Sequence, residues 1–535
     1  MTLYRSRAAN MSRLRFDVSV WVMVTMCVLS ARNCWAQGEY DPNYWNQQAH
    51  DLLFEKKDYT MQKVNIAKNI IVFVGSGMSQ ATVTAARTHK GGENATFPFE
   101  QLKWSGNART YCVDSRVPDS ACASTAFLTG VKSNLGTVAV HPNVKRGDCV
   151  ATSDKVKQLE SIAKWALAEG RVVGFATTSR VTAGSNAALY AHSADKDWEN
   201  DASVTAAGCN ATQVNDIAYQ LINGDVGKHF KVIFGGGRKN FIPNTETDES
   251  GARGLRTDGK NLIQEWKESK TGNAVYITTN SELGALNTTN IDYLMGLFSY
   301  DRLPYAADMG EEPNKETPPL VRMVHYSLEM LQKKEHSGGF LLFVEDGNIQ
   351  EAHKENKPIK AFEQVKHYAN AFNMAHMMVS EANTLLISMN DVGSTLSIPG
   401  YPARDTDILT EAGTSDKDSK PYLSLAYATG PSYDSYYQPN EGRVNPLAVL
   451  QGTPTQKEQT CSAAVPMSEG VNGGEDASVY ATGPWAFMFS GGYEQNFIAH
   501  AISFASCITD VCGGASSVVV SSAALLLALM VRVFA

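Results

Sequence analysis

The most reactive pattern in this chain is the run Val117–Thr125, VPDSACAST, in which Ser120 follows Asp119. The Ser/Thr/Ala-rich residues that follow predict a helix, and a helix beginning at Ser120 would present free backbone amides to an anion such as phosphate. A serine at this position can also act as a nucleophile when a base or a metal activates it. Taken alone, an Asp-Ser-Ala run is more typical of a helix N-cap than of a catalytic site.

Apolar runs alternate with amphipathic helical patterns along the chain. Several of these runs are apolar on both faces, as central strands of a covered parallel sheet must be. The predicted strands are Asn69–Val74, Val172–Thr177, Lys231–Phe234, Ala274–Thr279, Phe340–Val344 and Leu385–Met389. Helical spacing predicts one helix that Ser153 or Asp154 caps and that ends before Gly170, and a second that starts near Pro358. The alternation predicts an α/β sandwich with a mostly parallel sheet and helices on both faces.

Both ends of the chain carry targeting patterns. Residues 1–36 have a basic start, an apolar run at Val18–Leu29 and a small-residue cleavage site before Gln37, which together favour a removed secretory signal peptide. Small residues at 513–517 precede the apolar run Val518–Ala535, which favours a GPI-attachment signal. The alternative is a single transmembrane helix, but 18 residues is marginal and no basic tail follows. We therefore expect an extracellular protein anchored in the plasma membrane.

The composition agrees with a secreted globular protein. The chain has 535 residues, 43% of them hydrophobic, and a net charge of −8, which gives no basic field for nucleic acid. Sequons at Asn94, Asn210 and Asn287 are open to glycosylation in this compartment. Beyond the signal segment the cysteines are odd in number, so at least one is free or pairs between chains: Cys112, Cys122, Cys149, Cys209, Cys461, Cys507 and Cys512.

Colinear motifs give the chain a family resemblance. VPDSACAST is followed in order by TTSRV at 177–181, FGGGRKN at 234–240, FLLFVEDG at 340–347 and GGEDASVYATGP at 473–484. Together these motifs resemble metazoan alkaline phosphatases. The resemblance implies a three-layer α/β sandwich with about ten strands, a loop-rich crown insertion at about 395–470 and a homodimer. It also implies a family domain at 37–513, a GPI propeptide at 514–535, and disulfides Cys149–Cys209 and Cys507–Cys512, while Cys112, Cys122 and Cys461 stay unassigned.

The resemblance also implies a chemistry. In this family a serine between two zinc ions attacks a phosphate monoester, an arginine holds the phosphoryl oxygens, and a magnesium ion organises the water. The matching residues are Ser120 as the nucleophile and Arg180 as the phosphate clamp. Ser185, Glu345 and Asp391 occupy retained metal positions.

Six other positions of the metal-site pattern carry different residues. Zinc is bound through imidazole, thiolate or carboxylate groups, and hydroxyl or amide groups are poor replacements. The residues that stand at these positions are Ser76, Ala183, Gln350, Lys354, Val392 and Asn472. A shift of one residue, which would use His353, restores no Asp-His pair. The pattern therefore weighs against zinc binding and leaves part of a magnesium site.

Two hypotheses follow from these changes. In the first, the protein is an active, GPI-anchored alkaline phosphatase that uses altered ligands. In the second, which the six changes favour, it is a family member with lost or very weak catalysis that is kept as a cell-surface binding or scaffolding protein. The retained Ser120 and Arg180 would let such a protein bind phosphate or phosphomonoesters weakly. A serine hydrolase without metal has no motif support, because no histidine base lies near Ser120 in the sequence.

Overall fold

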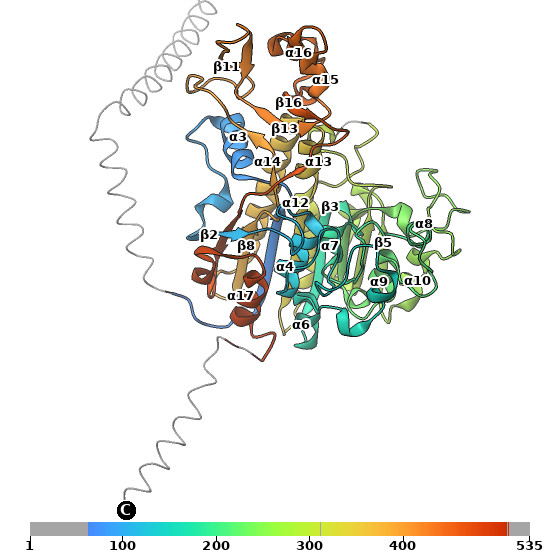
Figure 1. Cartoon of the computed structure of the whole chain (residues 1–535). Coiled ribbons are helices and arrows are strands. Elements are labelled where there is room, and N and C mark those ends of the chain that lie inside the picture. The colour runs from blue at the N-terminus through green and yellow to red at the C-terminus, as the bar shows by residue number, and fades with distance from the viewer. Residues whose placement is uncertain (1–61, 311, 511, 513–535) are drawn as a thin grey trace, which may run out of the picture. The chain divides into compact units, whose positions relative to one another are not determined.

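A computed structural model describes residues 62–310, 312–510 and 512 (Figure 1). The expected signal peptide at 1–36 and the propeptide at 514–535 lie outside these residues. Within the described part of the chain, no helix is long and apolar enough to cross a membrane.

A sheet of ten strands forms the centre of the molecule, in the order β19-β2-β18-β8-β1-β7-β3-β4-β6-β5. The strands from β8 to β5 in this order run parallel, whereas β18 is antiparallel to both β8 and β2. The parallel strands are β1 (Asn69–Gly75), β3 (Val172–Arg180), β4 (Val232–Gly236), β5 (Ala274–Ile277), β6 (Tyr293–Leu297), β7 (Phe340–Asp346) and β8 (Thr384–Met389). The remaining strands are β2 (Trp104–Arg109), β18 (Ala477–Thr482) and β19 (Gly491–Glu494). The expected α/β fold with a large, mostly parallel sheet is therefore confirmed.

Helices cover both faces of this sheet, because the central strands are apolar on both sides. In β1, Ile70 and Val72 belong to one core cluster, while Ile71 and Phe73 belong to the other. The first cluster includes residues of α4 (Ser120–Thr129), α6 (Ile162–Ala168) and α17 (Phe497–Ser506). The second includes residues of α3 (Gln80–Gly91), α12 (Leu320–Leu331) and α14 (Pro358–Met378). A sheet buried on both faces makes three layers, as expected.

One expected helix starts later than its sequence pattern indicates. Asp154 caps only a short 3-10 turn at Lys155–Lys157, and α6 begins at Ile162 with Ser161 as its N-cap. Leu159 N donates to Ala139 O at 2.9 Å, and Gln158 pairs with Val140 in an isolated bridge. These extended contacts prevent the helix from reaching back to Ser153. The second expected helix, α14, does begin at Pro358.

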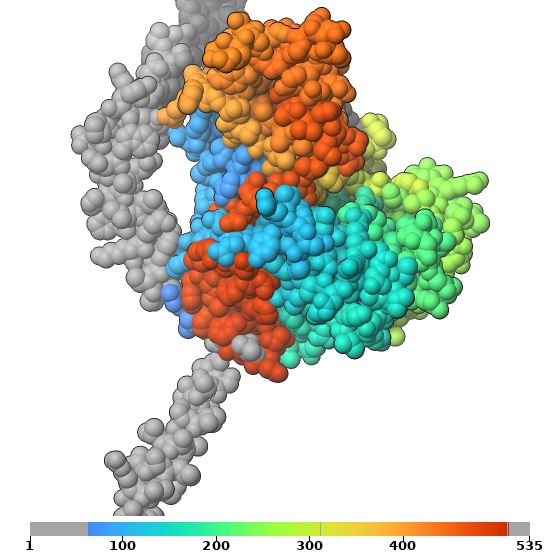
Figure 2. All heavy atoms as spheres, viewed as in Figure 1, coloured from blue at the N-terminus to red at the C-terminus, as the bar shows by residue number. Residues whose placement is uncertain are grey.

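A set of small elements stands over the carboxyl ends of the parallel strands and is drawn in orange in Figures 1 and 2. It contains a three-stranded sheet of β10 (Leu396–Ser397), β13 (Ala426–Gly430) and β16 (Ala463–Pro466). It also contains the pair β11 (Glu411–Thr414) and β12 (Pro421–Leu423), and the helices α15 (Tyr433–Tyr436) and α16 (Pro446–Gly452). Buried residues such as Leu425 and Tyr427 join it to the second core cluster. We call this set the crown.

Candidate active site

Ser120 is held at the start of α4 by its neighbours on both sides. The Asp119 side chain accepts a hydrogen bond from Cys122 N at 2.9 Å, which caps the helix, and Gly130 ends it in the left-handed conformation. Asp119 is therefore an N-cap, so the structure favours a capping role for this carboxylate. Burial raises the pKa of Asp119, while its bond to the Cys122 amide opposes that rise.

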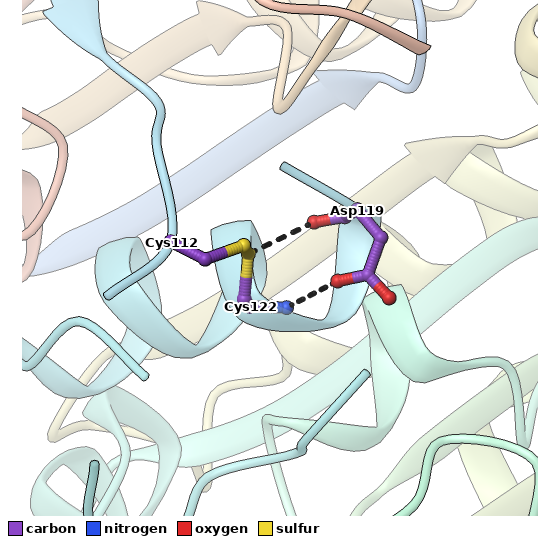
Figure 3. A group of neighbouring side chains, drawn as sticks. All are labelled: Cys112, Asp119 and Cys122. Carbon is purple, nitrogen blue, oxygen red and sulfur yellow. Dashed lines mark hydrogen bonds between the residues drawn. A yellow bond between two sulfur atoms is a disulfide. The ribbon is translucent and has the colours of Figure 1, made fainter. Parts of the chain in front are cut away.

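A disulfide between Cys112 and Cys122 fixes the segment that leads into the helix. The ligand atoms of Cys112, Asp119 and Cys122 lie within 4.8 Å of one another (Figure 3), but the two sulfur atoms are bonded to each other and are not free thiolates. This bridge accounts for two of the three cysteines that the sequence left unassigned, and the third, Cys461, is free and buried. The expected bridges Cys149–Cys209 and Cys507–Cys512 are confirmed.

The other candidate residues come from the carboxyl ends of the parallel strands, where loops of an open α/β sheet form binding sites. Ser76 follows β1, Arg180 ends β3, Glu345 lies within β7 and Asp391 follows β8. A cavity of about 370 Å³ opens at this edge, and its walls include Ser120, Arg180, Ser185 and Glu345. The structure thus brings these four candidates to one cavity.

Asp391 is fully buried and is joined to Ser120 through Ser76. Ser76 Oγ donates to Asp391 Oδ2 at 2.9 Å and lies 3.0 Å from Ser120 Oγ. The amides of Gly77 and Val392 donate to Asp391 Oδ1 at 3.3 and 2.7 Å. Burial raises the pKa of Asp391, and the hydrogen bonds from the two serines and the two amides oppose this rise.

Amide side chains close the other side of Ser120. Gln350, on α13 (Asn348–Lys354), donates through Nε2 to Asn472 Oδ1 at 2.8 Å, and Asn472 Nδ2 donates to Pro118 O at 3.0 Å. Gln350 Oε1 lies 3.4 Å from Ser120 Oγ. Lys354 also lines the cavity and forms an ion pair with Glu351 at 2.7 Å. The nucleophile position is therefore surrounded by hydroxyl and amide groups and by a paired ammonium.

Glu345 is fully buried and is bonded by neutral donors. Thr177 Oγ1 donates to Glu345 Oε2, and Asn186 Nδ2 donates to the same oxygen at 3.1 Å. Burial raises the pKa of Glu345, hydrogen bonds from Ser185 and Thr177 oppose the rise, and the nearby Asp391 charge adds to it. Asn186 Oδ1 is buried without a hydrogen-bond partner among the described residues.

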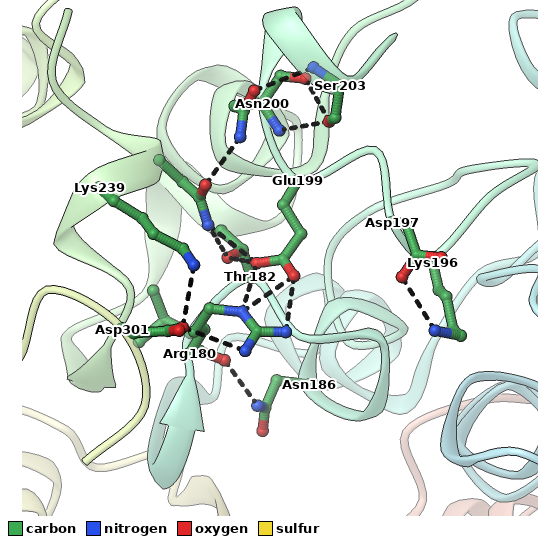
Figure 4. A network of polar contacts seen from close by, with 12 residues as sticks. Arg180, Thr182, Asn186, Lys196, Asp197, Glu199, Asn200, Ser203, Lys239 and Asp301 are labelled. Carbon is green, nitrogen blue, oxygen red and sulfur yellow. Dashed lines mark hydrogen bonds and ion pairs between the residues drawn. The ribbon is translucent and has the colours of Figure 1, made fainter. Parts of the chain in front are cut away.

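Arg180 is already paired with two carboxylates (Figure 4). Its Nη2 lies 2.8 Å from Glu199 Oε1, and its Nη1 lies 3.1 Å from Asp301 Oδ1. Burial acts to lower the pKa of Arg180, but the two carboxylates outweigh it and hold the pKa well above its usual value. Two further cations, Lys196 and Arg302, line the same cavity. Neither these two cations nor the two carboxylate partners of Arg180 could be predicted from the sequence, because no local spacing of residues marks any of the four.

Comparison with known proteins identifies the family. The sequence profile described as "Alkaline phosphatase" matches residues 67–508. The chain belongs to the alkaline phosphatase family. It is 37% identical to the membrane-bound alkaline phosphatase of Bombyx mori over 93% of this chain and 91% of that protein. It is 34% identical to the tissue-nonspecific isozyme of Homo sapiens over 88% of this chain and 89% of that protein.

Solved structures support the same fold. An alkaline phosphatase from the Antarctic bacterium TAB5 superposes with a TM-score of 0.58 at 16% identity, covering 83% of this chain and all of that one. The Thermus thermophilus alkaline phosphatase gives a TM-score of 0.58 at 20% identity, covering 84% of this chain and 93% of that one. The family reaction is the hydrolysis of phosphomonoesters.

The residues at this cavity do not fit two zinc ions. Among the described residues, the one group of three His, Cys, Asp or Glu side chains with ligand atoms within 4.8 Å of one another is Cys112, Asp119 and Cys122, and its two sulfur atoms are bonded to each other. The donors that gather beside Ser120 are hydroxyls and amides together with Asp391, and these are weak zinc ligands. Glu345 with Ser185 supplies oxygen donors of the kind that magnesium accepts. The donor set therefore matches a partial magnesium site better than a pair of zinc sites.

Proposed function

We propose that this protein is an alkaline phosphatase family member with lost or very weak catalysis, which binds phosphate or phosphomonoesters at the cell surface. The observation that carries this proposal is the neutral network of Ser76, Gln350 and Asn472 around Ser120. A serine hydroxyl needs a base or a metal to become a nucleophile, and none of these three groups supplies either.

The cavity still suits an anion. Its walls carry Arg180, Lys196, Arg302 and Lys354, and the amide end of α4 faces the same space. Because Arg180 pairs with Glu199 and Asp301, an incoming phosphate must compete with these carboxylates. We therefore expect weak phosphate binding, in which Ser120 and Arg180 contact the ligand.

We also propose that the protein is exported, loses residues 1–36 and is held on the outer face of the plasma membrane by a GPI anchor near 513–517. The terminal sequence patterns support this, and the Bombyx mori relative is described as membrane-bound. A homodimer is proposed from family membership.

The alternative is an active alkaline phosphatase with altered ligands. It is favoured by the retained Ser120, Glu345 and Ser185, which line one cavity, and by Asp391, which is joined to Ser120 through Ser76. Magnesium is the metal this set fits best, and a mutant of the TAB5 enzyme has been solved with Mg bound.

Elemental analysis of the purified, dialysed protein separates the two readings. We expect no stoichiometric zinc, together with very slow hydrolysis of p-nitrophenyl phosphate. Two zinc ions per chain would instead support the active enzyme. The anchor is tested separately, because phosphatidylinositol-specific phospholipase C should release the protein from cells. Recovery of intact residues 513–535 in a C-terminal peptide map would refute the anchor.

A further inference from the structure

A groove separate from the Ser120 cavity is lined by residues of α6 and of α9 (Ile217–Asn223), two helices that lie away from the crown (Figure 1). It consists of three hollows of about 350, 190 and 360 Å³. The first and second hollows share walls at Lys155 and His192, and the second and third share Lys164 and Asp225. None of the described residues in these walls also lines the Ser120 cavity. We call the three hollows together the side groove.

The first hollow carries neutral hydrogen-bonding groups. The side chains of Gln213 and Asn215 are exposed in its wall, and within the part of the chain that the structure describes their amides have no protein partner. Their backbone is nevertheless held in place, because Ser153 Oγ donates to Gln213 O at 3.0 Å and Gln220 Nε2 donates to Asn215 O at 2.8 Å. The Cys149–Cys209 disulfide joins the two chain segments concerned. Positioned amides with free donors and acceptors are prepared for a polar ligand, which then loses less freedom on binding.

His192 stands in the wall that the first two hollows share. Its Nδ1 lies 2.9 Å from Ala139 O, and because a carbonyl oxygen can only accept, Nδ1 must carry the hydrogen. The other ring nitrogen, Nε2, is then a hydrogen-bond acceptor. Burial lowers the pKa of His192, which keeps the ring neutral at physiological pH. A neutral acceptor in the wall suits a ligand that has hydroxyl groups to donate, and a simple anion has none.

The middle and the far end of the side groove carry cations. The groove walls contain four basic side chains and two carboxylates, namely Lys155, Lys164, Arg171 and Lys231 with Glu160 and Asp225. Asp225 is already paired with Lys228 at 3.3 Å, and the described residues give no ion pair to Lys155 or Lys164. Each lysine ammonium has three donors and no acceptor, so these positions suit a group that only accepts hydrogen bonds, such as sulfate. In a chain with a net charge of −8, this local excess of cations favours an anionic partner.

We propose that the side groove binds a sulfated oligosaccharide of the glycosaminoglycan type. Sugar hydroxyls donate to His192 Nε2 and exchange hydrogen bonds with the amides of Gln213 and Asn215, while sulfate groups accept from Lys164 and Lys231. A phosphate ion would use the cations alone, and a neutral sugar would use the amide end alone. Sulfated glycans lie outside the cell, so their encounter with the protein rests on its proposed export, whereas the affinity of the groove does not.

The test is a titration of the purified full-length protein, in detergent, against a fluorescently labelled heparin hexasaccharide. We expect saturable binding that weakens as salt is raised, because part of the affinity comes from exposed charges. Maltohexaose has the hydroxyl groups but no charge and should bind far more weakly. Inorganic phosphate added at constant ionic strength should not displace the hexasaccharide, because the groove and the Ser120 cavity share no wall residue.

Two double variants separate the charged end of the groove from its neutral end. Lys164→Gln with Lys231→Gln should weaken heparin binding about 10-fold, as expected for two partly exposed ion pairs, and Lys164→Arg with Lys231→Arg should keep the binding. Gln213→Ala with Asn215→Ala should weaken binding about fivefold without changing its dependence on salt, because only neutral hydrogen bonds are lost. Lys417→Gln, which removes a cation from the exposed turn of the crown, is the matched control and should leave the affinity unchanged.

Several outcomes would overturn the proposal. No binding of heparin, equal affinity for maltohexaose, or displacement by phosphate would each show that the ligand or the site is a different one. An unchanged affinity in the Gln213 and Asn215 variant would reduce the groove to a charged surface that does not recognise a sugar. The sequon at Asn210 lies close to Gln213 in the sequence, so Asn210→Gln should bind heparin as the parent does. Binding seen only in that variant would mean that a glycan on Asn210 covers the groove, which also contradicts the proposal.

Discussion

Replacing Ser120 with alanine should change phosphatase activity very little. In an active family member this substitution removes the nucleophile, so the loss is large. Here Ser120 Oγ lies 3.0 Å from the Ser76 hydroxyl and 3.4 Å from Gln350 Oε1, and it also bonds to the Asp391 carboxylate. A carboxylate is far too weak a base to ionise a serine hydroxyl, and the other two groups are neutral. The hydroxyl therefore stays protonated near neutral pH, and the parent protein gains little from having it.

The expected size of the defect follows from the number of lost charge stabilisers. Loss of one preorganised stabiliser commonly costs ~10²–10³-fold in rate. If both zinc positions are impaired, as the family pattern predicts, two such losses place the parent protein about 10⁴–10⁶-fold below an active relative. Ser120→Ala removes a group that contributes only to this small remainder.

The assay is hydrolysis of p-nitrophenyl phosphate with zinc and magnesium added, in parallel with zinc content after dialysis. The matched control restores the five family ligands: Ser76→Asp, Gln350→Asp, Lys354→His, Val392→His and Asn472→His. This control should gain bound zinc, and Ser120→Ala placed in it should abolish whatever activity it gains. Val392→His alone should gain neither zinc nor rate. A parent turnover typical of the family, lost with a chelator and with Ser120→Ala, would refute the reasoning.

Three further predictions test other contacts. Glu199→Gln should tighten phosphate binding about 5–10-fold, because it frees Arg180 from a partly exposed ion pair. Calorimetry measures this affinity, and an unchanged value would mean that Arg180 does not contact the ligand. Burial lowers the pKa of His353 to about 3 in the folded protein, whereas an unfolded histidine has a pKa of about 6.5. As pH drops below about 6.5, the unfolded chain therefore takes up a proton at His353 that the folded chain does not, and the free energy of unfolding falls. The His353 contribution is a loss of about 2 kcal/mol at about pH 5; His353→Gln should flatten that slope in urea titrations, and an unchanged slope would contradict it. Cys112→Ala with Cys122→Ala should lower the unfolding free energy by about 3 kcal/mol in the chain-entropy account, and an unchanged urea midpoint would show that the bridge contributes nothing.

The sequence predicted six of the seven parallel strands and missed β6 together with the three strands β18, β2 and β19. β6, YLMGL, was missed although Leu294 and Met295 belong to the two different core clusters. All six predicted strands are present, because a run such as Phe340–Val344 can be buried on both faces only within a covered sheet. β2 and β19 were missed because their sequences, WSGNAR and GGYE, are polar or glycine-rich, as suits strands at one edge of the sheet. β18 was missed because its small residues, ASVYAT, give no strong apolar signal.

The candidate site was predictable where it depends on topology. Residues at the end of β3 and just after β1 and β8 meet because the carboxyl ends of parallel strands share one edge, which places Ser76, Arg180 and Asp391 near Ser120. Contacts between distant loops carry no such signal. The pairing of Arg180 with Glu199 and Asp301, and of Cys112 with Cys122, depends on how loops pack, which spacing along the chain does not reveal.

The altered residues explain how this site can remain folded without relying on metal. A buried carboxylate is costly unless hydrogen bonds satisfy it, and Asp391 is satisfied by Ser76 and by the amides of Gly77 and Val392. Gln350 and Asn472 likewise satisfy each other at 2.8 Å. A hydroxyl and two amides thus stand where the family has carboxylate or imidazole ligands. These neutral groups form hydrogen bonds with their neighbours and leave no unpaired charge in the site. Under the function proposed above, such replacements let the chain keep the cavity and its cations without a bound metal.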